Sequence, residues 1–189
     1  MTKYAVYGVN AHPDYAFFAP LTAEAWRRIG YESIVLMVGD FTPSMHVVAR
    51  MLEQTHVRME RIYALPGYRT STLAQVGRVY GWAAAQADDY VIVGDVDLWP
   101  LRREWFEKHE APQGKLAILY ANNPDHFPMC YIAGHGGTWR EVLRLGDSTA
   151  TVQELAHAHL LAHLSRTTFA ADAWQHDEAW LTARIRQWP

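Results

Sequence analysis

The sequence predicts a single α/β domain over residues 1–189, with helices packed on a mostly parallel sheet. Two observations lead to this prediction. Short apolar runs of strand length alternate with segments that repeat apolar residues at helical spacing, which is the order of elements in an α/β fold. The chain also has no internal repeat, no low-complexity tract and no linker rich in Pro, Gly or Ser, so nothing divides it into two domains.

Six segments are expected to form strands, because each is a short run rich in aliphatic, β-branched or aromatic residues. They are residues 4–9, 33–38, 61–65, 90–93, 116–120 and 129–133. The run from Tyr90 to Val93 is apolar throughout, which is typical of a central strand buried on both faces.

The expected helices follow Pro20, Thr42, Thr72 and Thr138 and cover residues 151–164 and 177–187. Thr22 and Thr42 are expected as N-caps, because a threonine hydroxyl can accept a hydrogen bond from a free amide of the first turn. Gly30 is expected just past the end of the first helix. Thr72, with Gln75 three residues later, has the form of a capping box.

Composition excludes several classes of protein. Half of the residues are hydrophobic, so a packed core is expected rather than disorder. A formal charge of −3 provides no basic surface, and we therefore expect no nucleic-acid partner. The N-terminal residues contain no long apolar run, so neither a signal peptide nor a membrane span is predicted. The single cysteine, Cys130, favours a reducing compartment and a cytoplasmic location.

Two aspartates directly follow the central strand, in the run Gly94-Asp95-Val96-Asp97. Ligands of open α/β sheets bind outside the carboxyl ends of the strands, which is where these residues are expected. Two neighbouring carboxylates repel each other, and a hard cation such as Mn²⁺ or Mg²⁺ offsets that repulsion. The pair therefore suggests a metal site at Asp95 and Asp97, and the alternative is that Asp95 caps a turn while Asp97 is solvated.

The run Tyr90-Val-Ile-Val-Gly-Asp-Val-Asp-Leu-Trp-Pro-Leu101 resembles the strand and Asp-x-Asp motif of glycosyltransferases with the GT-A fold. The resemblance implies a GT-A, Rossmann-like α/β/α domain that binds a nucleotide-sugar donor through a divalent metal. It also implies transfer of the sugar to the hydroxyl of a glycan or another acceptor. UDP is the commonest donor nucleotide of the family, so a UDP-sugar is the first candidate.

The same resemblance suggests a donor side of the site. The segment Tyr4 to Asn10 is similar to the opening strand whose end touches the nucleobase in that family, and a later segment leads toward the donor. The implied donor-binding residues are Gly8, Val9, Asn10, Arg69, Gln75, Arg78 and Val96. Gln75 and Arg78 are three apart and can share a helix face, and an arginine there would neutralise phosphate charge.

Two further segments resemble the acceptor side of the family. The glycine-containing loop after Met129 and the late acidic motif from Trp174 to Glu178 are the segments concerned. The implied acceptor-side residues are Gly134, His135, Gly136, Trp174 and His176. The late motif implies a general base at Asp177 or Glu178. The family has the glutamate first and the aspartate second, and the reversed order here leaves open which one acts, with Asp177 preferred.

Family members often supply a histidine near the C-terminus as a third metal ligand. Here only His176 is available in that region. Either His176 serves, or water and the donor complete the coordination shell, or the chain is the N-terminal module of a longer protein.

Two other functions are kept as alternatives. Ala11-His12-Pro13-Asp14 resembles a loop of zinc-dependent sugar-amide deacetylases, but Tyr15 stands where that family needs a second aspartate. A non-catalytic nucleotide-sugar binding module would share the fold and the donor cleft without turnover.

A cluster of histidines is another candidate metal site. His159 and His163 are four residues apart and could bind zinc on one helix face, with His157 nearby. Without a glutamate in the His-Glu-x-x-His arrangement, ordinary core or surface histidines are expected there.

Overall fold

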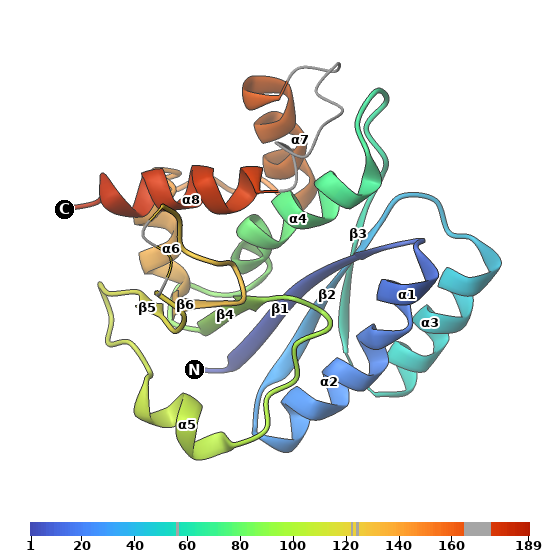
Figure 1. Ribbon diagram of the computed structural model, residues 1–189, viewed down its shortest axis with the longest axis horizontal. Coiled ribbons are helices and arrows are strands. Elements are labelled where there is room, and N and C mark those ends of the chain that lie inside the picture. The colour runs from blue at the N-terminus through green and yellow to red at the C-terminus, as the bar shows by residue number, and fades with distance from the viewer. Residues whose placement is uncertain (56, 122, 124, 165–174) are drawn as a thin grey trace.

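A six-stranded mixed sheet forms the centre of the protein (Figure 1). The computed structural model describes residues 1–189 except residues 56, 122, 124 and 165–174. The strands are β1 (Lys3–Asn10), β2 (Glu32–Val38), β3 (Arg58–Ile62), β4 (Tyr90–Gly94), β5 (Ala117–Ile118) and β6 (Tyr131–His135). Their order in the sheet is β3-β2-β1-β4-β6-β5. The first four are parallel, whereas β6 runs antiparallel to β4 and β5 antiparallel to β6. The predicted α/β domain with a mostly parallel sheet is confirmed.

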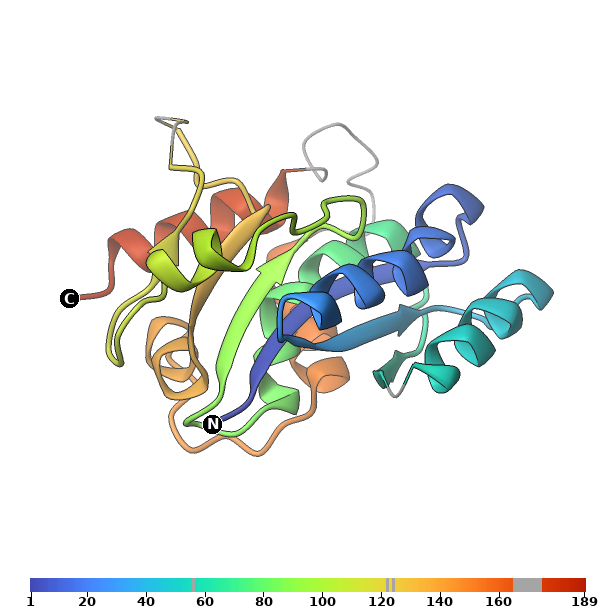
Figure 2. The same ribbon diagram turned by 90° about the horizontal axis from the view of Figure 1, so that it is seen from below.

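Helices cover both faces of the sheet (Figure 2). One face carries α4 (Thr70–Tyr80), the short 3₁₀ helix η1 (Gly81–Ala84), α6 (Gly136–Val142), α7 (Val152–His163) and α8 (His176–Arg186). The other face carries α1 (Pro13–Ala16), α2 (Phe18–Arg28), α3 (Pro43–Gln54) and α5 (Arg103–Lys108). Among the described residues, no helix has the length and apolar character that crossing a membrane requires.

Strand alternation divides the interior into two cores. On β1, Val6 packs into the core under α4 and α7, whereas Tyr7 packs into the core under α2 and α3. Leu36 and Met37 of β2 divide in the same way. Successive strand side chains point to opposite faces, so a strand covered on both sides is apolar at every position. This is why the central strands read as continuous apolar runs.

Several predicted boundaries were wrong. Helix α2 begins at Phe18, and Pro20 is accommodated in its first turn, where a missing amide hydrogen costs little. Thr22 is therefore not an N-cap: its side chain is buried, and its hydroxyl donates to the carbonyl of Val96. Helix α4 begins at Thr70, so Thr72 lies inside the helix and the predicted capping box does not form.

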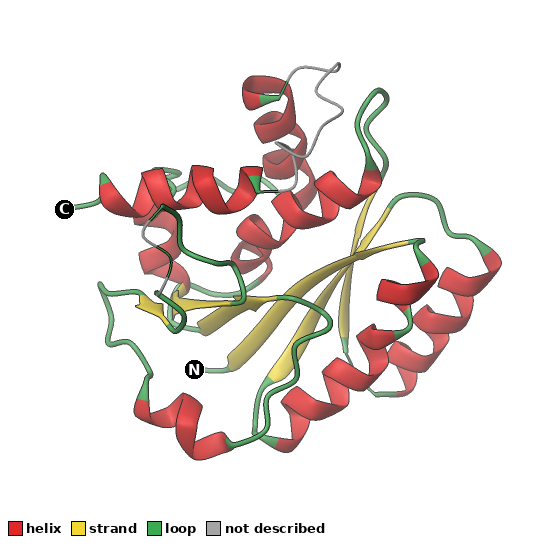
Figure 3. Cartoon of the chain, in the orientation of Figure 1, coloured by secondary structure: helices red, strands yellow, loops and turns green. Residues whose placement is uncertain are grey.

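Other elements differ in length or register. β3 covers residues 58–62 rather than 61–65, because its parallel pairing with β2 joins Arg58 to Ile34 and Ile62 to Val38. Residues 116–120 contribute only the two-residue edge strand β5, and α5 was not predicted. The cap of α3 is confirmed, since the Thr42 side chain accepts a hydrogen bond from the amide of Met45. Figure 3 shows the long loop that joins β4 to α5 beside α2.

Candidate functional site

A pocket of about 230 Å³ lies where the strand order changes direction. The chain proceeds from β1 to β2 and β3 on one side of the sheet, whereas β4 lies on the other side of β1. In open α/β sheets this switch point leaves a crevice at the carboxyl ends of the two central strands. The described residues that line the pocket are Gly8, Val9, Asn10, Tyr15, Ser71, Ala74, Gln75, Arg78, Gly94, Asp95, Val96, Asp97 and Glu178.

One face of α4 forms the wall of the pocket opposite the strand ends. Ser71, Ala74, Gln75 and Arg78 line it, and their spacing of three, one and three residues places them on one side of a helix. Gly8 lets β1 approach this helix closely, because a Cβ atom at Gly8 would collide with the backbone carbonyl of Ala74. The helix therefore lies against the strand end, and its polar side chains reach the crevice.

Arg78 is the central charge of the site. It is 7% exposed and forms ion pairs with Asp95 of the β4 loop and Asp177 of α8. The Nη2 and Nε atoms of Arg78 donate to Oδ2 of Asp177 at 2.7 and 3.0 Å. Burial opposes the charge on the guanidinium, but the carboxylates of Asp177 and Asp95 more than offset burial and raise the pKa of Arg78. Arg78 is thus a permanent cation at the base of the pocket.

Asp97 differs from Asp95 in its surroundings. It is exposed and lines the pocket, and no hydrogen bond or ion pair joins it to another described residue. Asp95 is half-buried and shares its Oδ1 atom with Arg78. Of the two predicted metal ligands, Asp97 therefore has its carboxylate available, whereas Asp95 is partly committed to a cation of the protein.

A divalent ion fits this pair only with help from a ligand. In the part of the chain that the structure describes, no cluster of three or more His, Cys, Asp or Glu side chains could hold a metal by itself. Mg²⁺ typically binds through one or two carboxylates and completes its coordination with water and substrate phosphates. Asp97, with the second oxygen of Asp95, provides that kind of partial site. The donor set thus suits a metal that arrives with a phosphorylated substrate.

The two acids at the start of α8 face different surroundings. Asp177 is 1% exposed and is committed to Arg78, and its Oδ1 atom has no hydrogen-bond partner among the described residues. Glu178 lines the pocket. Its Oε1 atom accepts from the amide of Met129 at 3.0 Å, and its Oε2 atom lies 2.9 Å from Nε2 of His126. Glu178, rather than the preferred Asp177, is thus the acid that a ligand in the pocket can reach.

Several predicted site residues are brought together by the structure. The donor-side residues in the pocket lining are Gly8, Val9, Asn10, Gln75, Arg78 and Val96. Arg69 is not among the lining residues and lies exposed at the start of α4. Trp174 lies outside the described residues.

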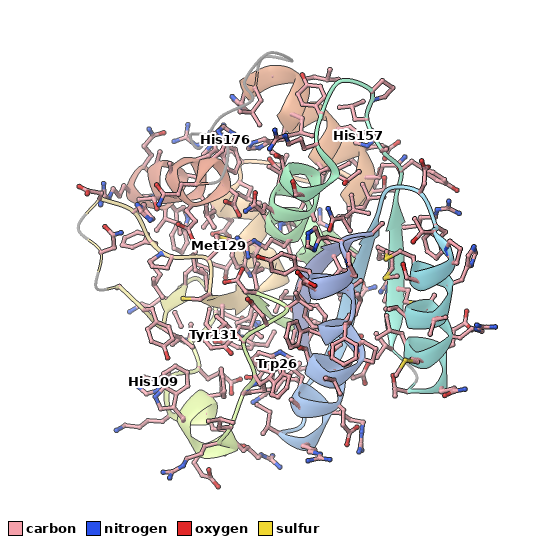
Figure 4. All side chains as sticks on the ribbon, turned by 45° about the vertical axis from the view of Figure 1, so that its right-hand side comes forward. Trp26, His109, Met129, Tyr131, His157 and His176 are labelled. Carbon is pink, nitrogen blue, oxygen red and sulfur yellow. The ribbon has the colours of Figure 1, made fainter. Side chains whose placement is uncertain are left out.

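The predicted glycine loop of the acceptor side lies at the opposite ends of the strands from the pocket. Tyr90, the first residue of β4, pairs with His135, and Gly94, the last, pairs with Tyr131. Gly134, His135 and Gly136 therefore lie beside the beginning of β4, away from the pocket. The prediction placed them near the acceptor because the segment resembles the glycine-containing loop of the GT-A family. The antiparallel direction of β6 instead places Met129, at the opposite end of the segment, near the start of α8 (Figure 4).

Sequence reasoning missed four lining residues: Tyr15, Ser71, Ala74 and Gly94. Ser71 and Ala74 could have been found, because they share the helical spacing of Gln75 and Arg78. Tyr15 lies in the short helix α1 that follows β1, and that helix was not predicted. No signal in the sequence distinguishes Tyr15 from an ordinary exposed tyrosine.

The histidines of α7 and α8 form a separate cluster above α4. Nε2 of His159 lies 2.8 Å from Nε2 of His176, and Nδ1 of His159 lies 2.9 Å from the hydroxyl of Tyr80. Burial lowers the pKa of both histidines. His176 is therefore engaged with another imidazole rather than directed at Asp97. Figure 4 shows His176 near the start of α8 and His157 on α7, where Nε2 of His157 lies 2.9 Å from the carbonyl of Tyr63.

Comparisons with known proteins do not assign this chain to a family. No family model matches this sequence, and no curated protein matches it significantly.

Proposed function

We propose that this chain is a metal-dependent glycosyltransferase of the GT-A type, which transfers a sugar from a nucleotide-sugar donor to an acceptor hydroxyl. One observation carries the proposal. The pocket at the switch point of the sheet combines the free carboxylate of Asp97 with the buried cation Arg78. A diphosphate is complementary to that combination, because it can bind a metal at the carboxylate and an arginine at the same time.

The residues of the pocket take separate roles in this proposal. Asp97 and Asp95 would hold Mn²⁺ or Mg²⁺, which supplies Lewis-acid stabilisation of the leaving nucleoside diphosphate. Arg78 provides a fixed positive charge on the same side of the donor. Gly8 to Asn10, with Tyr15, form the wall next to the end of β1 and would receive the nucleoside. UDP-sugars remain the first donors to test.

Glu178 is the group that would deprotonate the acceptor hydroxyl if the reaction inverts the anomeric configuration. A general base must reach the reacting proton, and Glu178 lines the pocket whereas Asp177 does not. Asp177 instead fixes Arg78. Asp177 thus orients the donor side of the site, whereas Glu178 provides the chemistry at the acceptor.

A non-catalytic nucleotide-sugar binding module is the second candidate, because the same pocket would bind the donor without turnover. The deacetylase alternative has less support. His12 and Asp14 are both exposed, with 3.9 Å between Nδ1 and Oδ2, and neither lines the pocket. It would predict acetate release that depends on zinc and on His12.

The discriminating experiment measures nucleoside diphosphate release from UDP-, GDP- and dTDP-sugars in the presence of Mn²⁺. We expect release with at least one donor, and a loss of about 100-fold or more for Asp97→Asn. Asp147→Asn is the matched control, because Asp147 is an exposed acid of the turn before α7. Calorimetric binding of a donor without release would favour the binding module. Full activity of Asp97→Asn would refute the assigned site.

A further inference from the structure

The segment that precedes β6 is fixed to α8 by three polar contacts. The amide of Phe127 donates to the Thr182 hydroxyl at 2.7 Å, and the amide of Met129 donates to Oε1 of Glu178 at 3.0 Å. Nε2 of His126 lies 2.9 Å from Oε2 of Glu178. About 50 residues separate the two segments in the sequence, and Glu178 receives two of the three contacts. The side chain of Glu178, which lines the pocket, is therefore held by His126 and Met129, a contact that the sequence did not suggest.

The contact between His126 and Glu178 is sheltered. The two side chains are 17% and 20% exposed, so solvent competes with the pair less than at an open surface. Among the described residues each oxygen of Glu178 has one protein partner, and a carboxylate oxygen has room for a second donor. The carboxylate thus keeps acceptor capacity for a ligand in the pocket while its orientation is fixed.

Nε2 of His126 and Oε2 of Glu178 are 2.9 Å apart, which is the distance of an ion pair when the imidazole is protonated. A carboxylate oxygen only accepts, so the contact is favourable when Nε2 carries a hydrogen atom. Nδ2 of Asn123 also lies 3.3 Å from the same nitrogen, and the amide of Asp125 donates to Oδ1 of Asn123. The Nδ2 atom of Asn123 only donates, so it can bond Nε2 only when that nitrogen carries no hydrogen atom. A protonated His126 therefore pairs with Glu178 alone through Nε2 among these two neighbours.

We propose that His126 is a positioning residue that orients the Glu178 carboxylate in the pocket. This inference rests on the proposed glycosyltransferase function. His126 and the Met129 amide hold the Glu178 carboxylate with its remaining lone pairs toward the acceptor hydroxyl. As the acceptor oxygen bonds to the anomeric carbon, its proton passes to Glu178. The bond from the anomeric carbon to the phosphate oxygen breaks, and its electron pair leaves with the nucleoside diphosphate.

The test uses water as the acceptor, so that no acceptor has to be known. The donor sugar that the wild-type protein hydrolyses is the probe, and kcat and KM are measured for nucleoside diphosphate release. His126→Leu removes the imidazole that contacts Glu178, whereas His126→Gln places an amide N–H near the position of Nε2. We expect kcat to fall about tenfold to a hundredfold in His126→Leu with an unchanged KM, and to recover largely in His126→Gln.

A double-mutant cycle separates this role from a general effect on structure. If His126 acts through Glu178, adding His126→Leu to Glu178→Gln should cause no further loss of kcat. His46→Leu, at an exposed histidine of α3, is the matched control and should leave kcat unchanged. Should His126→Leu fail to fold, His126→Asn replaces it, because its shorter amide ends before Oε2.

The outcomes are distinguishable. An unchanged kcat in His126→Leu, a His126→Gln variant as impaired as His126→Leu, or fully additive losses with Glu178→Gln would each overturn the role of His126 alone. Absence of nucleoside diphosphate release from every donor in the wild-type protein would overturn the proposed function and this role together.

Discussion

The buried imidazole of His159 makes folding stability depend on pH. His159 is 4% exposed, and burial lowers its pKa to about 3, with further contributions from His176 and His163. An unfolded chain binds a proton at an ordinary histidine below about pH 6.5, whereas native His159 does not. Because the native pKa is depressed, stability is retained above pH 6.5 and is lost as the pH falls toward 3. The slope is about 1.4 kcal/mol per pH unit, so the loss from pH 6.5 to 5.0 is about 2 kcal/mol.

The assay is urea unfolding of the wild-type protein and His159→Gln at pH 7.5 and pH 5.0. Glutamine keeps an amide near Tyr80 and His176 but gains no proton in this range. We expect the wild-type protein to lose about 2 kcal/mol more than the variant between the two pH values. His46→Gln, at an exposed position, should retain the wild-type pH dependence. Equal losses in the wild-type protein and His159→Gln would refute the reasoning.

Two further predictions concern the packing of the pocket. Asp177→Ala leaves the buried charge of Arg78 without its main partner, and we expect a loss of about 3–5 kcal/mol in urea unfolding, whereas Asp147→Ala should change stability by less than about 0.5 kcal/mol. If Asp177→Ala were as stable as the wild-type protein in urea unfolding, Arg78 would have to reach solvent, and the reasoning would be wrong. Gly8→Ala introduces a Cβ against the carbonyl of Ala74 and should displace α4, so calorimetry should detect weaker UDP binding than in the wild-type protein. Unchanged affinity would show that the approach of β1 to α4 does not shape the pocket.

The fold was largely predictable because local pattern and global architecture agree. Tyr90 to Val93 is apolar at each position because helices cover both faces of β4, and a buried strand has no polar face to reveal its register. Strand direction was not predictable in the same way. Nothing in the residues 129–133 distinguishes a parallel from an antiparallel strand, and the antiparallel direction of β6 puts Gly134 to Gly136 beside the start of β4, away from the pocket.

The candidate site was predictable where one segment supplies the residues. Asp95 and Asp97 follow a strand, and Gln75 and Arg78 share a helix face. Each pair could therefore be predicted from the pattern of a single segment. The partnership of Arg78 with Asp177 could not, since 99 residues separate them and only tertiary packing brings them together. Arg78 also pairs with Asp95, and this pairing changes the role assigned to Asp95, because a carboxylate that pairs with arginine is less available to a metal.

The acidic pair at the start of α8 shows why sequence order alone does not tell which of the two acids reaches the pocket. Consecutive helix residues project about 100° apart, so two adjacent acids cannot face the same partner. Asp177 faces α4 and meets Arg78, whereas Glu178 faces the pocket and segment 125–129. Which acid is chemically useful therefore depends on the rotation of α8 about its axis. Thr182, one helical turn beyond Glu178, holds the amide of Phe127 and so fixes that rotation. The reversed order of the two acids is consistent with a functional site for this reason: the orientation of the helix selects the residue that reaches the pocket.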